Sequence, residues 1–260
     1  MYFSIICPTY NSSKFIRKTI YSLINQKYRN FEVIFSDDGS TDNTIEILNN
    51  YRLEFMKVGI DIFIIKSEHK GPGHARNKAL QLARYDWISF IDSDDLWSEN
   101  KLIRVSNFLK KNIDYNCILH RQFFLGLNNK IKEYNYDKYF NSKLPVKKQL
   151  FKSPFIAMST VTIKKHLIIE VGGFNEKYQN AQDYDLWLRI GDDFKMHILP
   201  EFLGSYCERV GNITSKPYLL RIKNILIILY KNKKNIGKIT YFLAIIKVLL
   251  NKEWFSKIFK

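Results

Sequence analysis

The feature that most constrains this chain is an alternation of two kinds of apolar run between residue 1 and about residue 120. Short runs rich in β-branched residues are typical of strands, and they alternate with longer runs whose apolar residues recur at helical spacing. The short runs are FSIIC, FEVIF, IDIFIIK, DWISFI and YNCILH. Strands that alternate with helices favour a parallel sheet covered by helices on both faces. We therefore predict an α/β fold built on a mostly parallel sheet.

Polar clusters follow three of these predicted strands. Residues 8–11 (PTYN) follow the first strand, residues 37–40 (DDGS) the second and residues 92–95 (DSDD) the fourth. In a parallel sheet the carboxyl ends of the strands lie at one edge, where such sheets bind their ligands. A polar turn that merely ends a strand explains one such cluster, whereas three at the same edge favour a binding site.

The residue types in these clusters suit a nucleoside diphosphate. Asp92 and Asp94 offer hard oxygen ligands to Mg²⁺ or Mn²⁺, a cation that bridges few carboxylates and substrate phosphates and neutralises a departing diphosphate. Tyr10 offers a ring face to a nucleobase, and Asp38 can accept a hydrogen bond from a base N–H. Arg76, at the start of a predicted helix, can meet phosphate together with helix N-terminal amides.

Six motifs occur in a fixed order over roughly residues 1 to 210: CPTYN, FSDDGSTD, GPGHARN, FIDSDDLW, GGFNE and QDYDLWLR. This series resembles family 2 glycosyltransferases of the GT-A fold. The resemblance implies an inverting enzyme that moves a sugar from a nucleotide-sugar donor, most often UDP-linked, to an acceptor hydroxyl. It also implies Mn²⁺ or Mg²⁺ as cofactor.

By position, the resemblance implies that Pro8, Tyr10 and Asp38 hold the uracil and that Arg76 lies near the diphosphate. Asp92 and Asp94 would form the DxD pair. Asp94 is then expected to be the leading metal ligand, while Asp92 contacts ribose or metal-bound water. Asp95 is expected to be a neighbour of this pair.

Length and composition fit one large core, with or without an appendage. Residues 1–120 are predicted to form the nucleotide-sugar-binding half of a GT-A domain, and residues 121–216 its acceptor-binding half. Residues 217–260 form a basic tail. Within the acceptor half, the polar and aromatic segment 128–153 has no clean period, so we interpret it either as a solvated loop or as an acceptor-facing loop that tolerates phosphate.

The run QDYDLWLRI at residues 182–190 has apolar residues at helical spacing, which places Asp183 at the start of a helix. The helix dipole stabilises a carboxylate there and keeps it ionised. An inverting displacement needs a base that removes the acceptor proton, and the family position points to Asp183, with Asp185 second. The structural alternative for Asp183 is a plain N-cap. Trp187 either stacks on a sugar or is buried, and Arg189 is a candidate ion-pair partner.

Cysteine and histidine positions give no metal or disulfide framework. Cys7, Cys117 and Cys207 are far apart and lack CxxC spacing, which favours a reducing compartment. The apolar run after Met1 is predicted to be a first strand rather than a signal peptide. His69 and His74 flank a Gly-Pro-Gly turn and can reach a donor phosphate.

Basic residues are concentrated in the tail. Residues 217–260 hold ten Lys or Arg against one acid, so they carry +9 of the net charge of +16. Their apolar runs are shorter than the roughly 20 residues that a membrane-spanning helix needs. Apolar faces mixed with Lys, followed by Trp254, Phe255 and Phe259, favour amphipathic helices on an anionic membrane surface. The alternatives are that these helices close over the catalytic core or form a dimer contact.

These observations predict a cytoplasmic enzyme, peripheral on the inner face of the cell membrane. Its expected acceptor is a glycan or lipid-linked glycan precursor of a capsule, lipooligosaccharide or O-antigen. Because the chain has neither a QxxRW motif nor the several membrane spans of polymerising synthases, we expect one sugar to be added to each acceptor.

Two other functions fit parts of the pattern. A sugar-1-phosphate nucleotidyltransferase also uses a doubly wound sheet and Mg²⁺, but it usually has a Gly-rich phosphate loop where this chain has PTYNSS. A basic module that binds membrane or nucleic acid, with a degenerate catalytic domain, fits the positive net charge. The acids at the predicted site are nevertheless intact, and we expect no nucleic-acid partner.

Overall fold

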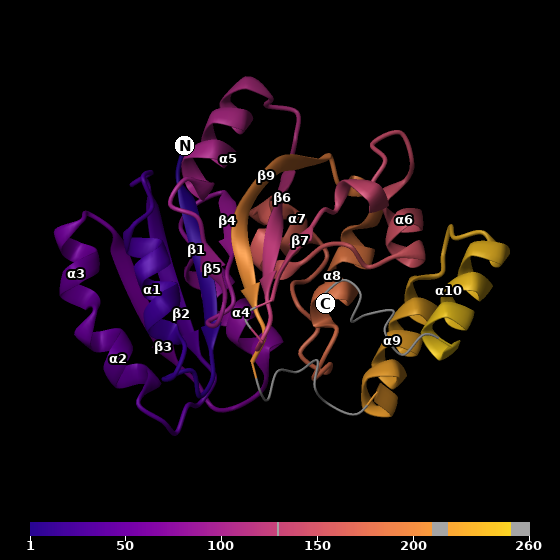
Figure 1. The fold of residues 1–260 in the computed structure, drawn as a ribbon. Coiled ribbons are helices and arrows are strands. Elements are labelled where there is room, and N and C mark those ends of the chain that lie inside the picture. The colour runs from indigo at the N-terminus through magenta and orange to yellow at the C-terminus, as the bar shows by residue number, and fades with distance from the viewer. Residues whose placement is uncertain (129, 210–217, 251–260) are drawn as a thin grey trace.

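The computed structural model describes residues 1–128, 130–209 and 218–250, which form one sheet with helices on both faces (Figure 1). Four parallel strands make up one side of the sheet, in the order β3-β2-β1-β4. Their bounds are β1 Phe3–Thr9, β2 Phe31–Asp37, β3 Asp61–Lys66 and β4 Trp87–Phe90. Each lies in one of the predicted apolar runs, and the prediction of a parallel sheet is confirmed on this side.

The other side of the sheet is mixed. From β4 the described strands continue in the order β8-β6-β9-β5, and β7 pairs with β6. β8 is antiparallel to both β4 and β6, β9 is parallel to β6, and β5 is antiparallel to β9. The bounds are β5 Leu96–Trp97, β6 Cys117–Leu125, β7 Ile131–Tyr134, β8 Thr162–Lys164 and β9 Met196–Cys207. The last predicted strand, YNCILH, therefore becomes β6 and is separated from β4 by a strand that comes later in the chain.

Side chains alternate between two hydrophobic cores, one on each face. Along β1, Phe3 and Ile5 point into one core and Ile6 into the other, as the pleat of a strand requires. The first core includes α1 Ile16–Ile24, α2 Thr44–Asn50, α3 Arg52–Lys57 and α5 Lys101–Lys111. The second includes α4 Pro72–Leu82, α6 Val146–Lys152, α7 Lys165–Glu170 and α8 Gln182–Ile190. The described residues also form 3-10 turns η1 Asp137–Tyr139, η2 Met158–Thr160 and η3 Gly191–Asp193.

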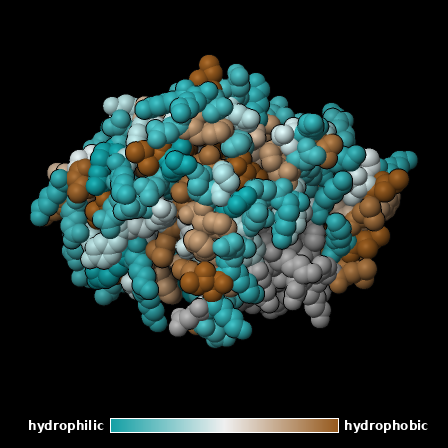
Figure 2. Space-filling model, turned by 45° about the horizontal axis from the view of Figure 1, so that its top comes forward, coloured by the Kyte–Doolittle hydropathy of each residue, from teal (hydrophilic) through white to brown (hydrophobic). Residues whose placement is uncertain are grey.

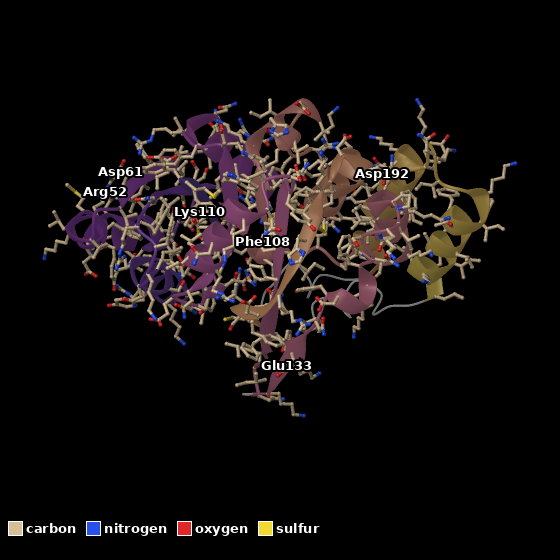
Figure 3. The ribbon with its side chains drawn as sticks, turned by 90° about the horizontal axis from the view of Figure 1, so that it is seen from above. Arg52, Asp61, Phe108, Lys110, Glu133 and Asp192 are labelled. Carbon is tan, nitrogen blue, oxygen red and sulfur yellow. The ribbon has the colours of Figure 1, made fainter. Side chains whose placement is uncertain are left out.

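The segment 128–153 is more ordered than a solvated loop. Its described residues contain β7, η1 and α6, and Tyr136, Leu150 and Phe151 are buried. The interpretation as a solvated loop is therefore wrong. No single period showed in the sequence because one strand, one 3-10 turn and one short helix follow each other within it. The β6–β7 hairpin, marked by Glu133, projects from the body of the molecule (Figure 3).

The tail packs on the catalytic core through α9 (Tyr218–Asn232) and α10 (Lys238–Leu250). These helices lie at the end of the molecule opposite α2 and α3, where α9 contacts α8 and α10 contacts α6 (Figure 1). Their inward side chains join the second core: Ile225, Ile228, Leu229, Ala244 and Val248. The predicted alternative in which the tail packs on the core is thus confirmed for its described part, and Trp254, Phe255 and Phe259 lie outside the described residues. Over the parts of the chain that the structure describes, no helix has the length and apolar character to span a membrane.

Candidate active site

The three polar clusters meet at the carboxyl edge of the parallel strands. The backbone N–H of Asp38 donates to the carbonyl of Thr9 over 2.9 Å, and the N–H of Asn11 donates to Ser40 Oγ over 2.9 Å. The hydroxyls of Ser12 and Ser93 share a hydrogen bond of 2.8 Å. The loops after β1, β2 and β4 are therefore joined to one another, as the sequence predicted.

An exposed aromatic ring, that of Tyr10, lies at this edge of the sheet. Tyr10 is 42% exposed and stacks on His69, with ring centroids 4.1 Å apart and planes inclined by 17°. His69 Nδ1 lies 2.8 Å from Asp38 Oδ2. Pro8 and Asp38 are buried, so Tyr10 alone of the three residues predicted to hold the uracil presents a wide surface. His69, which is expected to be able to reach a donor phosphate, lies beside this ring.

Asp38 fixes the loop that leads into α4. Its carboxylate accepts the backbone N–H groups of Lys70 (2.9 Å) and Gly71 (2.8 Å). Gly39 next to it has a φ of +78°, and a Cβ there would lie 2.9 Å from the backbone nitrogen of His69. Both the left-handed backbone and the close approach require glycine. The DDG motif thus holds the loop after β3 against the loop after β2.

Arg76 on α4 lies beside the acidic loop, which is formed by residues 92–95. It is 6% exposed, one guanidinium nitrogen donates to Asp92 Oδ1 over 2.7 Å, and its guanidinium carbon is 5.6 Å from the centre of the Phe174 ring. Its Nε is buried and has no hydrogen-bond partner among the described residues. Arg76, which is predicted to lie near the diphosphate, is therefore paired with Asp92, the first aspartate of the DxD motif. Its Nε–H remains available as a donor.

The other two acids of the cluster are held by residues far along the chain. Asp94 Oδ2 accepts a hydrogen bond from Arg209 Nε. Asp95 is 2% exposed and accepts from Ser159 Oγ (2.5 Å) and from the backbone N–H of Cys207 (3.1 Å). Ser159 Oγ also accepts the backbone N–H of Asp92 over 3.0 Å. Neither Ser159 nor Arg209 was expected at this site, because neither belongs to a recognisable motif.

Burial and crowding affect the protonation of these carboxyls. Burial raises the pKa of Asp95 well above its ordinary value, and the neighbouring Asp94 and Asp92 charges add to the rise. Burial also raises the pKa of Asp94, the Arg209 guanidinium opposes this, and Asp92 reinforces it. A cation at this position therefore favours the ionised form of Asp94.

The DxD pair can supply two oxygen ligands to a cation. Asp92 Oδ2 and Asp94 Oδ1 accept no hydrogen bond from the described residues, and the side chain of Asp92 is 35% exposed. Across the described part of the chain, no group of three His, Cys, Asp or Glu residues is placed to hold a metal. Two carboxylates with the remaining positions filled by phosphate and water suit Mg²⁺. The residues thus fit a cation shared with a diphosphate and do not form a complete site for a metal alone.

Asp183 lies in the first turn of α8, as predicted, but it is not the N-cap. That position belongs to Ala181, which has a left-handed φ of +57° and gives no side-chain cap. Asp183 Oδ1 accepts the backbone N–H of Tyr184 over 2.8 Å. Burial raises the pKa of Asp183, the Arg76 guanidinium opposes the rise, and the Asp92 carboxylate adds to it. The charges of Arg76 and Asp92 therefore both act on the candidate base. Burial raises its pKa, whereas the helix dipole suggested by the sequence lowers it.

Three other residues of α8, Asp185, Trp187 and Arg189, have structural roles. Asp185 is 2% exposed and accepts a hydrogen bond of 2.8 Å from Arg189 Nε, whose other nitrogens donate to the carbonyls of Val171 and Gly173. The second candidate base is thus enclosed in an ion pair, which confirms the role expected of Arg189. Trp187 is 1% exposed, so of its two predicted alternatives the buried one is confirmed and sugar stacking is excluded.

Comparisons with known proteins show the family of this chain. A family model described as Glycosyl transferase family 2 matches residues 4–172, more than half of the chain. The chain belongs to this family. It is a glycosyltransferase whose three polar clusters lie inside the matched residues, while Asp183 and Arg209 lie beyond them.

Two relatives align with most of this glycosyltransferase. An uncharacterized glycosyltransferase of Methanocaldococcus jannaschii is 30% identical over 250 residues, which cover 92% of this chain and 83% of the relative. The UDP-Glc:alpha-D-GlcNAc-diphosphoundecaprenol beta-1,3-glucosyltransferase WfgD of Escherichia coli is 34% identical over 191 residues, which cover 73% of this chain and 70% of WfgD.

A solved structure shares the fold. S. aureus TarS 1-349 in complex with UDP-GlcNAc superposes with a TM-score of 0.71 at 23% identity, covering 98% of this chain and 73% of that one. A longer TarS chain gives a TM-score of 0.70, and this chain covers 43% of it. The GT-A fold that the motifs predicted is therefore confirmed.

Proposed function

We propose that this enzyme transfers one sugar from a UDP-sugar to a hydroxyl of a lipid-linked glycan, with inversion at the anomeric carbon. The observation that carries the proposal is the meeting of an exposed aromatic ring and a DxD pair at one edge of the sheet, where the Arg76 and Asp92 charges also shift the pKa of Asp183. WfgD, 34% identical, is named for UDP-glucose and a diphosphoundecaprenol-linked acceptor. TarS, which shares the fold, has been captured with UDP-GlcNAc.

In this proposal Tyr10 and Asp38 bind the uracil, and Arg76 lies below the diphosphate. Asp183 takes the proton of the acceptor hydroxyl while the acceptor oxygen forms a bond to the anomeric carbon. The bond from that carbon to the phosphate oxygen breaks on the opposite side, and UDP leaves with the electron pair. Mn²⁺ or Mg²⁺, held by Asp92 and Asp94 when bound, supplies positive charge against the leaving diphosphate.

The test combines binding with transfer. We expect UDP and one or more UDP-sugars to raise the melting temperature more than GDP, CMP or dTDP, and the shift to grow with Mn²⁺, because a ligand of the native state stabilises it. The best UDP-sugar is then incubated with a sugar-diphospholipid acceptor, and the product is analysed for anomeric configuration and for the number of sugars added. Retention of configuration, or release of pyrophosphate from UTP and a sugar phosphate, would contradict the proposal.

We also propose that α10 places the enzyme on an anionic membrane surface. Six exposed apolar side chains form a stripe along the helix: Ile239, Phe242, Leu243, Ile246, Leu249 and Leu250. Apolar atoms gather at this end of the molecule in Figure 2. The tail that carries the stripe has a charge of +9, which complements anionic headgroups while the apolar side chains enter the interface. A lipid-linked acceptor would then lie in the same surface as the enzyme.

A further inference from the structure

Arg209 is held on two sides beside the acidic cluster. It follows the end of β9 by two residues, and its Nε donates to Asp94 Oδ2. Its guanidinium carbon lies 4.9 Å from the centre of the Phe15 ring. The side chains are 28% exposed for Arg209 and 12% for Asp94. A guanidinium between a carboxylate and an aromatic face is fixed in place more firmly than an arginine in water.

The negative charges of Asp92, Asp94 and Asp95 explain why the arginine side chain lies here. Asp92, Asp94 and Asp95 crowd into one loop, where Arg76 pairs with the first and Arg209 with the second. Asp95 takes its hydrogen bonds from neutral groups. Among the described residues, Asp94 has no cationic partner besides Arg209. Without Arg209, Arg76 would be the one remaining positive charge paired with either of the neighbouring carboxylates of Asp92 and Asp94 among the described residues.

The carboxylate that Arg209 holds is the one expected to lead in binding the metal. A guanidinium stays protonated throughout the pH range in which proteins are folded. It therefore competes with a divalent cation both for the negative charge of the Asp94 carboxylate and for the space beside it. A cation that binds the free Oδ1 of Asp94 is repelled by the guanidinium on Oδ2 of the same carboxylate, and tight binding of the cation requires this pair to separate. A diphosphate bound at the same edge offers the displaced guanidinium a new anionic partner.

We propose that Arg209 is the resident cation of the Asp94 carboxylate and that a divalent metal displaces it efficiently only together with the donor diphosphate. This inference rests on the proposed function, because it needs a diphosphate at this edge. Arg209 is then a positioning residue that sets how strongly metal and nucleotide depend on each other. Thermodynamic linkage requires that UDP strengthens Mn²⁺ binding by the same factor by which Mn²⁺ strengthens UDP binding.

The test measures Mn²⁺ binding to the full chain with and without saturating UDP, by the loss of the free Mn²⁺ signal in electron paramagnetic resonance. The proteins are the wild type, Arg209→Gln, Phe15→Leu and Arg104→Gln. Phe15→Leu removes the ring beneath the guanidinium and keeps its charge. Arg104→Gln is the matched control, because Arg104 pairs with Glu201 on β9 and this pair involves none of the acidic cluster.

Without UDP, Arg209→Gln is expected to bind Mn²⁺ more tightly than the wild type by on the order of tenfold, since a charge-assisted pair no longer has to be broken. The factor by which UDP strengthens Mn²⁺ binding should shrink correspondingly. Phe15→Leu should shift both quantities in the same direction by less, and Arg104→Gln should match the wild type.

Equal Mn²⁺ affinities of the wild type, Arg209→Gln and Phe15→Leu in the absence of UDP would overturn the role of Arg209, even if all of them bind UDP. Failure of every protein to bind UDP would instead contradict the proposed function. The nucleotide-free titration would still decide whether Arg209 competes for Asp94, so the two failures are distinguishable.

Discussion

Asp183 experiences opposing effects at the first turn of α8. The helix N-terminus and Arg76 favour its ionised form, whereas burial and Asp92 favour the protonated form, and burial prevails. A carboxyl whose pKa is raised toward neutrality is a stronger proton acceptor once it is ionised. This environment suits a general base better than that of an exposed aspartate.

For Asp183 we predict a pH dependence with a defined sign. Turnover requires the ionised carboxylate, so kcat should be full above the raised pKa and fall as the pH drops through it. The acid limb should therefore lie at a higher pH than an ordinary carboxyl would give. A kcat profile between pH 4 and 9 at saturating donor and acceptor checks this, and an acid limb at the pKa of an exposed aspartate would contradict it.

Asp183→Asn should separate binding from chemistry. It removes the proton acceptor, so kcat should fall by about 10² to 10⁴, while UDP binding stays. Because the folded protein raises the pKa of Asp183, the stability that this carboxyl contributes is greatest below its unfolded pKa and is lost as the pH rises through the folded pKa. The variant should thus melt at the same temperature as the wild type or higher at pH 7. Normal turnover would overturn the role of this residue.

Ser159 connects two members of the acidic loop, and we predict that it orders that loop. Ser159→Ala leaves the Asp92 N–H without a partner and removes one of the two hydrogen bonds to the Asp95 carboxylate, a loss of about 1–3 kcal/mol in the free energy of unfolding. The same change should weaken UDP binding in the presence of Mn²⁺. Ser106→Ala is a matched control, because Ser106 is also buried and its hydroxyl has no partner among the described residues. Equal unfolding free energies for both variants would contradict the prediction.

Among the helices, α10 carries apolar side chains on two opposite sides. Ala244 and Val248 are buried against the second core, while the apolar stripe defined above faces outward. A helix with apolar residues on both sides is typical of a buried element, yet this one lies at the end of the molecule (Figure 1). The outward stripe is therefore the part of the surface best suited to a lipid partner.

We predict that the stripe controls membrane binding. Phe242→Gln with Ile246→Gln should lower sedimentation with liposomes containing anionic lipid by tenfold or more, on the order of the burial energy of two large side chains. The control is Leu53→Gln with Met56→Gln, which changes two equally exposed apolar residues on α3 at the opposite end. Unchanged sedimentation of the α10 variant, or a wild-type dimer that this variant converts to a monomer without any liposome binding, would contradict the membrane assignment.

At the scale of the whole molecule, the parallel side of the sheet was predictable because its signals are local. The strand runs are adjacent to their crossover helices, and the polar clusters follow directly after the strand ends. Hydrogen bonds such as Asn11 to Ser40 and Ser12 to Ser93 then bring the clusters together. The position of Asp183 in a helix was predictable for the same reason, since helical spacing runs through QDYDLWLRI.

The remaining features depend on contacts between distant segments. Arg209 is 115 residues from Asp94 and Ser159 is 64 residues from Asp95, so no local pattern joins them. Trp187 is enclosed by Phe90 and Phe194, which come from β4 and from the turn after α8. Whether an aromatic residue on a helix faces a sugar or the core depends on such packing. The segment 128–153 was missed because its elements are too short to establish a period.

β9 joins regions that the sequence separates. It belongs by position to the predicted acceptor-binding half and pairs with β6 along most of its length, yet Leu96 and Trp97 pair with residues near its end and the backbone N–H of Cys207 donates to Asp95. The acceptor half is therefore not an exchangeable cassette. A chimaera that imports a foreign acceptor half must break either the β6–β9 register or the β5–β9 pairing. The shorter β5–β9 pairing is the better junction, so residues 117–207, which contain the whole of β6 and β9, should be transplanted together.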